Sequence, residues 1–349
     1  MNETIESAPA AYRAALTGAA LADQGARGRI FMRGRDRAAL LHRLSTNDIE
    51  RLRPGQGART ALTSPIGRMI DLLTVHALDD ALLVVTSPGQ GGAVWAHLKK
   101  NIFFNDQVTL EAAGRSHGLL ALYGPAAAAL IEQVSGAALA GLPLHSIIEI
   151  ELAGTRVLAA RREPIGGPSF SLYVPAEQLE AVRGALVAGG AAPLDEATLD
   201  ILRVEQGYGA YGRELSLEYI PLETGLLDAV SFTKGCYVGQ EIIARMESRG
   251  RLAKLLRGLR LKTKDERPTT NDDLDQPPVD RLSSLVLPAK LEVDGKESGD
   301  LTSIVISPRF GPIALAYVRA AHAEPGTLVG IAGSDLRGEV VELPFDAGG

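Results

Sequence analysis

At Leu252 the sequence changes from mixed helical and strand-like segments to short strand-like runs, and this change limits the possible fold more than any other feature. Beyond Leu252, short strand-like runs are separated by turn residues such as Pro308, Gly311 and Pro325. The expected strands are 254–262, 285–293, 301–307, 313–318, 327–331 and 336–343. Short strands at regular spacing with turns between them are typical of a small all-β barrel or sandwich.

Before Leu252, strand-like and helical segments alternate. Runs such as 69–76 and 82–86 have the composition of strands, whereas 176–188 has the pattern of a helix. This alternation of hairpins and helices predicts an α+β fold with antiparallel sheets.

The composition divides the chain into three domains. An Ala-rich stretch within 1–28 predicts an N-terminal helical arm, and residues 29–250 predict an αβ core. Residues 251–349 form the expected β-barrel. Within it, 264–280 is rich in Pro, Asp and Thr, so we expect a polar, exposed insertion there.

Overall composition narrows the possible functions. A length of 349 residues suggests two or three domains, and 46% hydrophobic residues suit a soluble globular protein. The 36 basic and 42 acidic residues give a net charge of −6, which argues against a nucleic-acid partner. No apolar run reaches membrane-spanning length, and the first ten residues show no secretory or transit pattern. We therefore expect a cytoplasmic protein without a membrane partner.

The sequence does not predict a metal site or a nucleotide-binding loop. The six histidines are scattered, without an HExxH pattern or a tight cluster. The run 89–92 lacks the spacing of a dinucleotide-binding motif, and we interpret it as a turn.

Cys236 is the only cysteine of the chain, and residues 234–241 around it read Lys-Gly-Cys-Tyr-Val-Gly-Gln-Glu. A single cysteine indicates a reducing compartment rather than a disulfide scaffold. We expect a helix from about Gly239 to Ser248, so that its N-terminus and Lys234 would lower the pKa of the thiol. Two interpretations stay open for Cys236, a small buried hydrophobic residue and a functional thiol.

The segment 234–241 closely resembles the K-G-C-Y-x-G-Q-E signature of YgfZ-type folate-binding proteins, which are relatives of the glycine cleavage system T protein. Weaker motifs in the expected order extend this resemblance over about residues 29–346. They are Thr46-Asn47-Asp48, Gly67-Arg68-Met69-Ile70-Asp71, Leu202-Arg203-Val204-Glu205-Gln206-Gly207, Ala314-Leu315-Ala316-Tyr317-Val318, Pro325-Gly326-Thr327 and Glu342-Leu343-Pro344-Phe345.

The resemblance implies a cloverleaf of two αβ subdomains with antiparallel sheets and a C-terminal barrel. The two subdomains would be intertwined, one formed by 29–60 with 118–250 and the other by 61–117. The implied cofactor is tetrahydrofolate or a one-carbon derivative, held in a central channel. The implied role is assembly or repair of iron–sulfur enzymes, with client proteins or assembly factors as partners.

The resemblance also indicates two carboxylates of the site. Glu205 lies on an apolar helical run and matches the family's glutamate, so it would accept donors from the pterin edge. Asp71 would lie near the reactive nitrogens of the folate and handle a proton or a one-carbon unit. For each residue, the alternative is an ordinary solvated charge. The transferases usually have two adjacent acidic residues at the second position, whereas this chain has Asp71-Leu72.

Four further residues are candidates for the folate site. Phe170 could pack on the pterin ring or belong to the core. Arg245 could bind the folate's glutamate tail or pair with Glu241 one helical turn away. Lys234 and Tyr237 flank Cys236 and complete the expected cofactor-binding set.

Three functions are compatible with these residues. The first is a tetrahydrofolate-binding accessory protein for iron–sulfur enzymes, in which Cys236 supplies a functional thiol. The aminomethyltransferases usually have an acidic residue at the position of Cys236, and this difference favours the YgfZ type. The second is a folate-dependent one-carbon transferase that uses Asp71. The third is a non-enzymatic interaction module.

Overall fold

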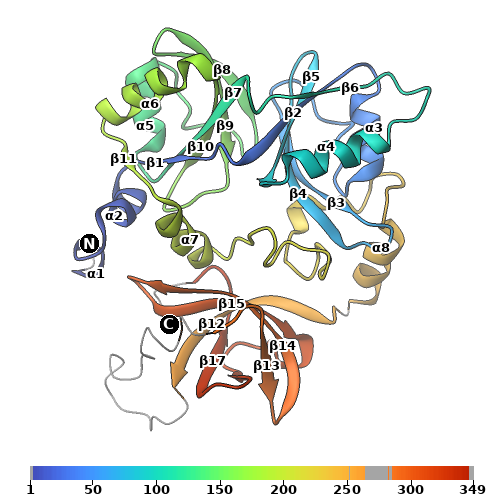
Figure 1. Ribbon diagram of the computed structural model, residues 1–349, viewed down its shortest axis with the longest axis vertical. Coiled ribbons are helices and arrows are strands. Elements are labelled where there is room, and N and C mark those ends of the chain that lie inside the picture. Colours follow the sequence, from blue (N-terminus) through green and yellow to red (C-terminus); the bar gives the residue numbers. More distant parts are fainter. Residues whose placement is uncertain (1–2, 251, 264–281, 283–284, 346–349) are drawn as a thin grey trace. The chain divides into compact units, whose positions relative to one another are not determined.

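The computed structural model describes residues 3–250, 252–263, 282 and 285–345 (Figure 1). The chain folds into two compact units, which we describe one at a time. The two-sheet unit consists of Pro9–Thr198 and Leu227–Ile242. The barrel unit consists of Met1–Ala8, Leu199–Leu226 and Ile243–Gly349.

The first sheet of the two-sheet unit has six strands, antiparallel except for the pairing of β1 with β11. Across the sheet the strands are β11 (Ala192–Pro193), β1 (Ala20–Asp23), β7 (His117–Tyr123), β10 (Ser169–Pro175), β9 (Thr155–Arg162) and β8 (Ile147–Leu152).

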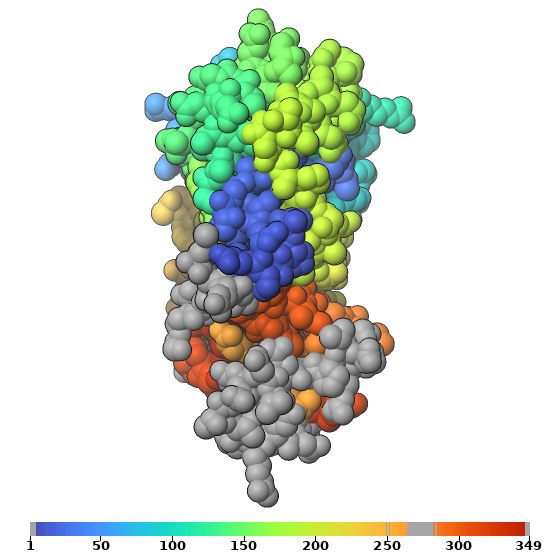
Figure 2. Space-filling model, turned by 90° about the vertical axis from the view of Figure 1, so that its left-hand side faces the viewer, coloured from blue at the N-terminus to red at the C-terminus, as the bar shows by residue number. Residues whose placement is uncertain are grey.

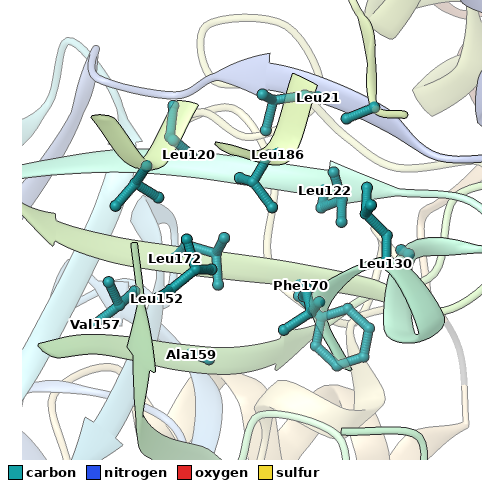
Figure 3. Close-up of a cluster of buried hydrophobic side chains, with 14 of the residues drawn as sticks. Leu21, Leu120, Leu122, Leu130, Leu152, Val157, Ala159, Phe170, Leu172 and Leu186 are labelled. Carbon is teal, nitrogen blue, oxygen red and sulfur yellow. The ribbon is translucent and has the colours of Figure 1, made fainter. Parts of the chain in front are cut away.

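Helices α5 (Ala127–Ser135) and α6 (Leu179–Ala188) cover one face of this sheet. Alternate strand residues point into the core beneath them, where Leu120, Leu172 and Leu186 are fully buried (Figure 3). Gly136 follows the last residue of α5, and its φ of 72° is the left-handed conformation typical of the position after a helix C-terminus.

The second sheet has five strands, all antiparallel. Its strands are β3 (Gly57–Thr63), β4 (Met69–Ala77), β5 (Ala81–Pro88), β2 (Arg27–Arg33) and β6 (Thr109–Ala112). Helices α3 (Arg37–Leu44) and α4 (Gly91–Lys100) pack on one face through residues such as Leu41 and Leu98.

The other faces of the two sheets pack against each other. One buried cluster contains Phe31 and Leu83 of the five-stranded sheet together with Leu119, Ala160 and Tyr173 of the six-stranded sheet. Polar residues near this inter-sheet core therefore come from both sheets.

The N-terminal segment differs from the expected helical arm. It contains α1 (Glu3–Glu6) and α2 (Ala10–Thr17), but β1 follows within it and is a strand of the six-stranded sheet. Helix α2 packs closely on glycines of that unit, because a Cβ atom at Gly166 would lie 2.0 Å from the Ala15 carbonyl oxygen. Figure 2 shows this blue segment against green and yellow-green residues.

The expected grouping of the core into 29–60 with 118–250, and 61–117, is also corrected. Strand β2 pairs with β5 and β6, and β3 pairs with β4, so 27–112 supplies the whole five-stranded sheet. Pairing between distant strands depends on hydrogen bonds that local patterns do not encode.

The barrel unit contains a closed six-stranded barrel. In barrel order its strands are β12 (Lys254–Thr263), β15 (Gly311–Arg319), β14 (Lys296–Ser307), β13 (Ala289–Val293), β16 (Leu328–Ile331) and β17 (Leu336–Val341). The six strands expected beyond Leu252 are all present, and the α+β fold with antiparallel sheets and a C-terminal barrel is confirmed. The expected insertion 264–280 lies outside the described residues.

The segment Leu199–Leu226 belongs to the barrel unit although it precedes the barrel in sequence. Tyr219 stacks on the barrel residue Tyr317, with ring centroids 3.4 Å apart. Arg203 bonds both Glu214 and Ser303, at 3.0 and 2.8 Å. Helix α7 (Glu196–Glu205) enters this segment from the two-sheet unit, and α8 (Gln240–Arg249) also crosses the boundary.

The remaining elements are short. They are the 3-10 helices η1 (Ala176–Gln178), η2 (Leu227–Ala229) and η4 (Ala320–His322). Among the described residues, no helix combines the length and apolar character needed to cross a membrane.

Candidate functional site

The loop that carries Cys236 is fixed by the lysine at its start. The Lys234 Nζ donates hydrogen bonds to the backbone oxygens of His42, Ser45 and Asn47, at 2.6, 2.7 and 2.7 Å. An ammonium group has three protons, so these bonds use all of its donors. Burial lowers the pKa of Lys234 to about 8. Lys234 therefore anchors the loop. The sequence had suggested that Lys234 binds a cofactor, but its three donors are already used.

The same loop is fixed again after the cysteine. The Val238 amide donates to the Arg43 carbonyl at 3.0 Å, and the Thr63 hydroxyl donates to the Val238 carbonyl at 2.5 Å. Gly239 has a φ of 83°, and a Cβ atom there would lie 2.7 Å from the Ser64 carbonyl oxygen. Only glycine fits this approach to the β3–β4 turn without strain.

Between these two fixed points, Cys236 is exposed. The interpretation of Cys236 as a buried core residue is therefore wrong. Helix α8 begins at Gln240, one residue later than expected, so the thiol lies four positions before the first helical residue.

The Thr46-Asn47-Asp48 motif anchors the segment that leads into this loop. The Thr46 hydroxyl donates to the Ala229 carbonyl at 2.6 Å, and the Asn47 amide donates to the Asp228 carbonyl at 2.9 Å. The motif and the cysteine loop, nearly 200 residues apart, thus form one structural unit.

Asp71 is a buried carboxylate on β4, only 1% exposed. The β3–β4 ladder is irregular next to it, since Leu62 pairs with Asp71 while Thr63 pairs with Met69. Such bulges re-aim side chains and are frequent beside active sites. The amides of Leu72 and Ser87 donate to its two oxygens at 2.9 and 3.0 Å.

Burial is the largest influence on the pKa of Asp71 and raises it, while these two amides and Arg27 act in the opposite direction. Asp71 can therefore hold a proton at higher pH than an ordinary aspartate, which suits a group that exchanges protons with a substrate.

A group of charged and polar side chains that we did not predict lies around Arg27 and includes Asp71. Arg27 interacts electrostatically with Asp71, Glu163, Arg162 and Tyr123. These residues come from β2, β4, β7 and the end of β9, so both sheets contribute. We call these five residues the inter-sheet polar cluster. Little in the sequence indicated this cluster, because each member is a single polar residue within or next to a strand.

Glu205 belongs to the barrel unit and is 1% exposed. The Ser307 hydroxyl donates to its Oε1 at 2.5 Å, and the Phe345 amide donates to its backbone oxygen at 2.8 Å. The alternative of a solvated helix charge is therefore wrong for Glu205, and that of a solvent-facing strand residue is wrong for Asp71.

Phe170 is completely buried in the core between the six-stranded sheet and its helices (Figure 3). Arg161 lies over its ring, 5.1 Å from the centroid. This placement favours the core interpretation, and we leave Phe170 out of the proposed folate site.

The last two candidates lie in and after the cysteine loop. Tyr237 is half-buried, and the Lys234 Nζ lies 4.9 Å from the centroid of the tyrosine ring. Burial raises the pKa of Tyr237 to about 12. Arg245 and Glu241 are both exposed on α8, and no ion pair joins these two described residues. The pairing of Arg245 with Glu241 is therefore not supported.

Comparison with known proteins identifies the family. A model of the GCVT N-terminal domain matches residues 3–234, and a model of the glycine cleavage T-protein C-terminal barrel domain matches residues 275–346. The chain belongs to the glycine cleavage T-protein family. Within this family, an Arabidopsis thaliana protein named as a chloroplastic transferase is 30% identical over 98% of this chain and 75% of its own length.

Other family members are similar over most of their length. The aminomethyltransferase of Listeria welshimeri is 29% identical over 96% of this chain and 89% of its own. That of Geobacillus kaustophilus is 31% identical with the same coverage. The crystal structure of glycine cleavage system aminomethyltransferase T from Bartonella henselae has a TM-score of 0.81 at 23% identity, covering 96% of this chain and 88% of its own. That last similarity shows the fold.

Proposed function

We propose that the chain binds tetrahydrofolate, or a one-carbon derivative of it, and transfers a one-carbon group with Asp71 as the acid–base residue. Membership of a family that includes aminomethyltransferases supports the reaction class. The observation that carries the proposal is Asp71 itself, a buried carboxylate with a raised pKa that interacts with Arg27.

The residues present fit a reduced folate. Its pterin ring offers several hydrogen-bond donors along one edge, and a buried carboxylate is the group that accepts them best. Glu205 is buried and receives the Ser307 hydroxyl on Oε1, which holds the carboxylate in one orientation. We assign Glu205 to the pterin edge in this proposal.

A bound tetrahydrofolate would supply the ring nitrogens that carry the one-carbon unit. Asp71 would hold or release a proton at the reacting nitrogen, while the Leu72 and Ser87 amides keep its two oxygens in place. The next residue, Leu72, carries no acidic group, so Asp71 would perform the proton handling at this position.

Tetrahydrofolate binding and single-turnover transfer from aminomethyl or N-methyl donors test this proposal. We expect Asp71→Asn to keep binding within a few-fold and to lower the transfer rate by about 10²–10⁴. Glu205→Gln should instead weaken binding by about tenfold or more, because a charged acceptor is lost. Absence of tetrahydrofolate binding by the wild type would refute the proposal.

The exposed thiol supports a second candidate, the accessory role in iron–sulfur enzyme assembly or repair. The loop is anchored at Lys234 and Gly239 but leaves Cys236 exposed, as a residue that meets a client protein must be. In a deletion strain under oxidative stress, Cys236→Ser should bind folate but fail to restore iron–sulfur enzyme activity. Full complementation by this variant would rule out the thiol role.

A further inference from the structure

Two buried donor groups of the inter-sheet polar cluster have no hydrogen-bond partner among the described residues, and the Glu163 Oε1, which pairs with Arg59, makes no hydrogen bond there either. Tyr123 is fully buried at the end of β7, and the Arg162 guanidinium lies 4.8 Å from its ring centroid. Among the residues that the structure describes, neither the Tyr123 hydroxyl nor the Arg162 Nε finds an acceptor or donor. Buried polar groups of this kind are rare in native proteins and call for an explanation.

Both groups lie on the side of the six-stranded sheet that packs on the other sheet. Along β9, Ala160 belongs to the inter-sheet core and Ala159 to the core beneath the helices. Side chains alternate along a strand, so Arg162 faces the five-stranded sheet while Arg161 faces the helices. The stacking of Arg161 on Phe170 agrees with this assignment.

Arg27 of the five-stranded sheet adds a second positive charge. Its Nε donates to the Gln24 side chain at 3.1 Å and its Nη1 to the Thr86 carbonyl at 3.4 Å. Burial lowers the pKa of Arg27, and the charge of Arg162 lowers it further. Two guanidinium groups of half-buried side chains thus repel each other, a cost that an anion would relieve.

The nearby carboxylates only partly neutralise this charge. Arg59 contacts Glu163 at 3.2 Å and Asp228 at 2.7 Å, so this single arginine serves two carboxylates. Glu163 also interacts electrostatically with Arg162 and Arg27. Arg27 also interacts with Asp71, whose pKa is raised by burial.

We propose that Arg162, Tyr123 and Arg27 form a binding site for a carboxylate group of a ligand, next to Asp71. A guanidinium offers parallel donors that match the two oxygens of a carboxylate, and the tyrosine hydroxyl donates a further bond. The added negative charge balances the second arginine. The site is inferred from these observed residues only, and it rests on the proposed function only for the identity of the folate.

Two ligands of the proposed reaction carry this chemistry. One is the glutamate tail of tetrahydrofolate, and the other is an N-methylated or free amino acid that donates the one-carbon unit. Tetrahydropteroate, which lacks the glutamate, separates them when it is compared with tetrahydrofolate. Sarcosine and glycine serve as probes for the second ligand.

The test measures binding of these four probes by calorimetry to wild type, Arg162→Gln and Tyr123→Phe. The control is Arg161→Gln, which removes the neighbouring guanidinium on the opposite face of the same strand. We expect Arg162→Gln to weaken a carboxylate probe by about ten- to a hundredfold and Tyr123→Phe by about fivefold. Arg161→Gln should bind every probe as the wild type does.

The pattern of losses identifies the source of the carboxylate. Weaker tetrahydrofolate but unchanged tetrahydropteroate binding assigns the site to the glutamate tail, whereas weaker sarcosine or glycine binding assigns it to the second substrate. If all probes bind Arg162→Gln and Tyr123→Phe as tightly as wild type, the site does not exist. The same conclusion follows if Arg161→Gln causes an equal loss. Failure to bind either folate, with sarcosine binding that depends on Arg162, would refute the proposed function and leave this site intact.

Discussion

At the scale of single residues, a buried histidine connects the two sheets. The His145 backbone oxygen lies 2.8 Å from the His76 Nδ1, and the Tyr173 hydroxyl lies 3.0 Å from the Nε2. A carbonyl oxygen can only accept, so Nδ1 carries the proton and Nε2 accepts from Tyr173. Burial lowers the pKa of His76 to about 4 and raises that of Tyr173 to about 12. Both groups are therefore neutral at physiological pH.

His76 makes the stability of the protein depend on pH. Folded His76 stays neutral down to about pH 4, whereas in the unfolded chain it binds a proton below about pH 6.5. The unfolded state thus binds more protons between these values, and the free energy of unfolding falls as pH decreases. We expect a loss of up to about 3 kcal/mol from this residue between pH 7 and pH 4.

Urea denaturation over this pH range measures the effect. The His76→Gln variant should be less stable at pH 7 but should lose less stability on acidification than the wild type. Identical pH slopes for the two proteins would show that His76 is not responsible.

At the scale of elements, the cysteine loop contains glycines, yet contacts with other segments fix its conformation. Glycines flank Cys236 in the sequence, but only one of them is required by geometry. Gly239 has a positive φ and touches the backbone of the β3–β4 turn, whereas a Cβ atom at Gly235 would meet no atom within 4 Å. Gly239 therefore lies at a contact between two segments, whereas a methyl side chain at Gly235 would meet no neighbour.

This difference gives a paired prediction. Gly239→Ala should lower the free energy of unfolding by about 2 kcal/mol or more, because a left-handed conformation and a backbone clash add up. Gly235→Ala should change it by less than about 0.5 kcal/mol. Guanidinium denaturation of both variants measures the effect, and equal stability of the two would contradict the proposed contact.

At the scale of the molecule, the barrel unit does not coincide with the C-terminal part of the sequence. The Tyr317 hydroxyl donates to the Glu214 carbonyl at 2.8 Å, and the ring stacks on Tyr219. Glu214 also binds Ser303 at 2.7 Å. The segment Leu199–Leu226 thus buries one side of the barrel, and a barrel without it would expose Tyr317.

We therefore expect a fragment of residues 252–349 to lack a cooperative thermal transition. A fragment of residues 199–349 retains the covering segment and should unfold cooperatively, as monitored by circular dichroism. Similar transitions in both fragments would mean that the covering segment contributes little to barrel stability.

The sequence by itself determined the fold class and the six barrel strands, because these follow from local periodicity, while the family resemblance proposed Asp71, Glu205 and Cys236 as site residues. It did not determine which strands share a sheet, nor the role of Lys234 as an anchor. It also gave no indication that Arg27, Tyr123 and Arg162 meet. Those features depend on contacts between segments far apart in the chain, which only the packing of the two sheets brings together.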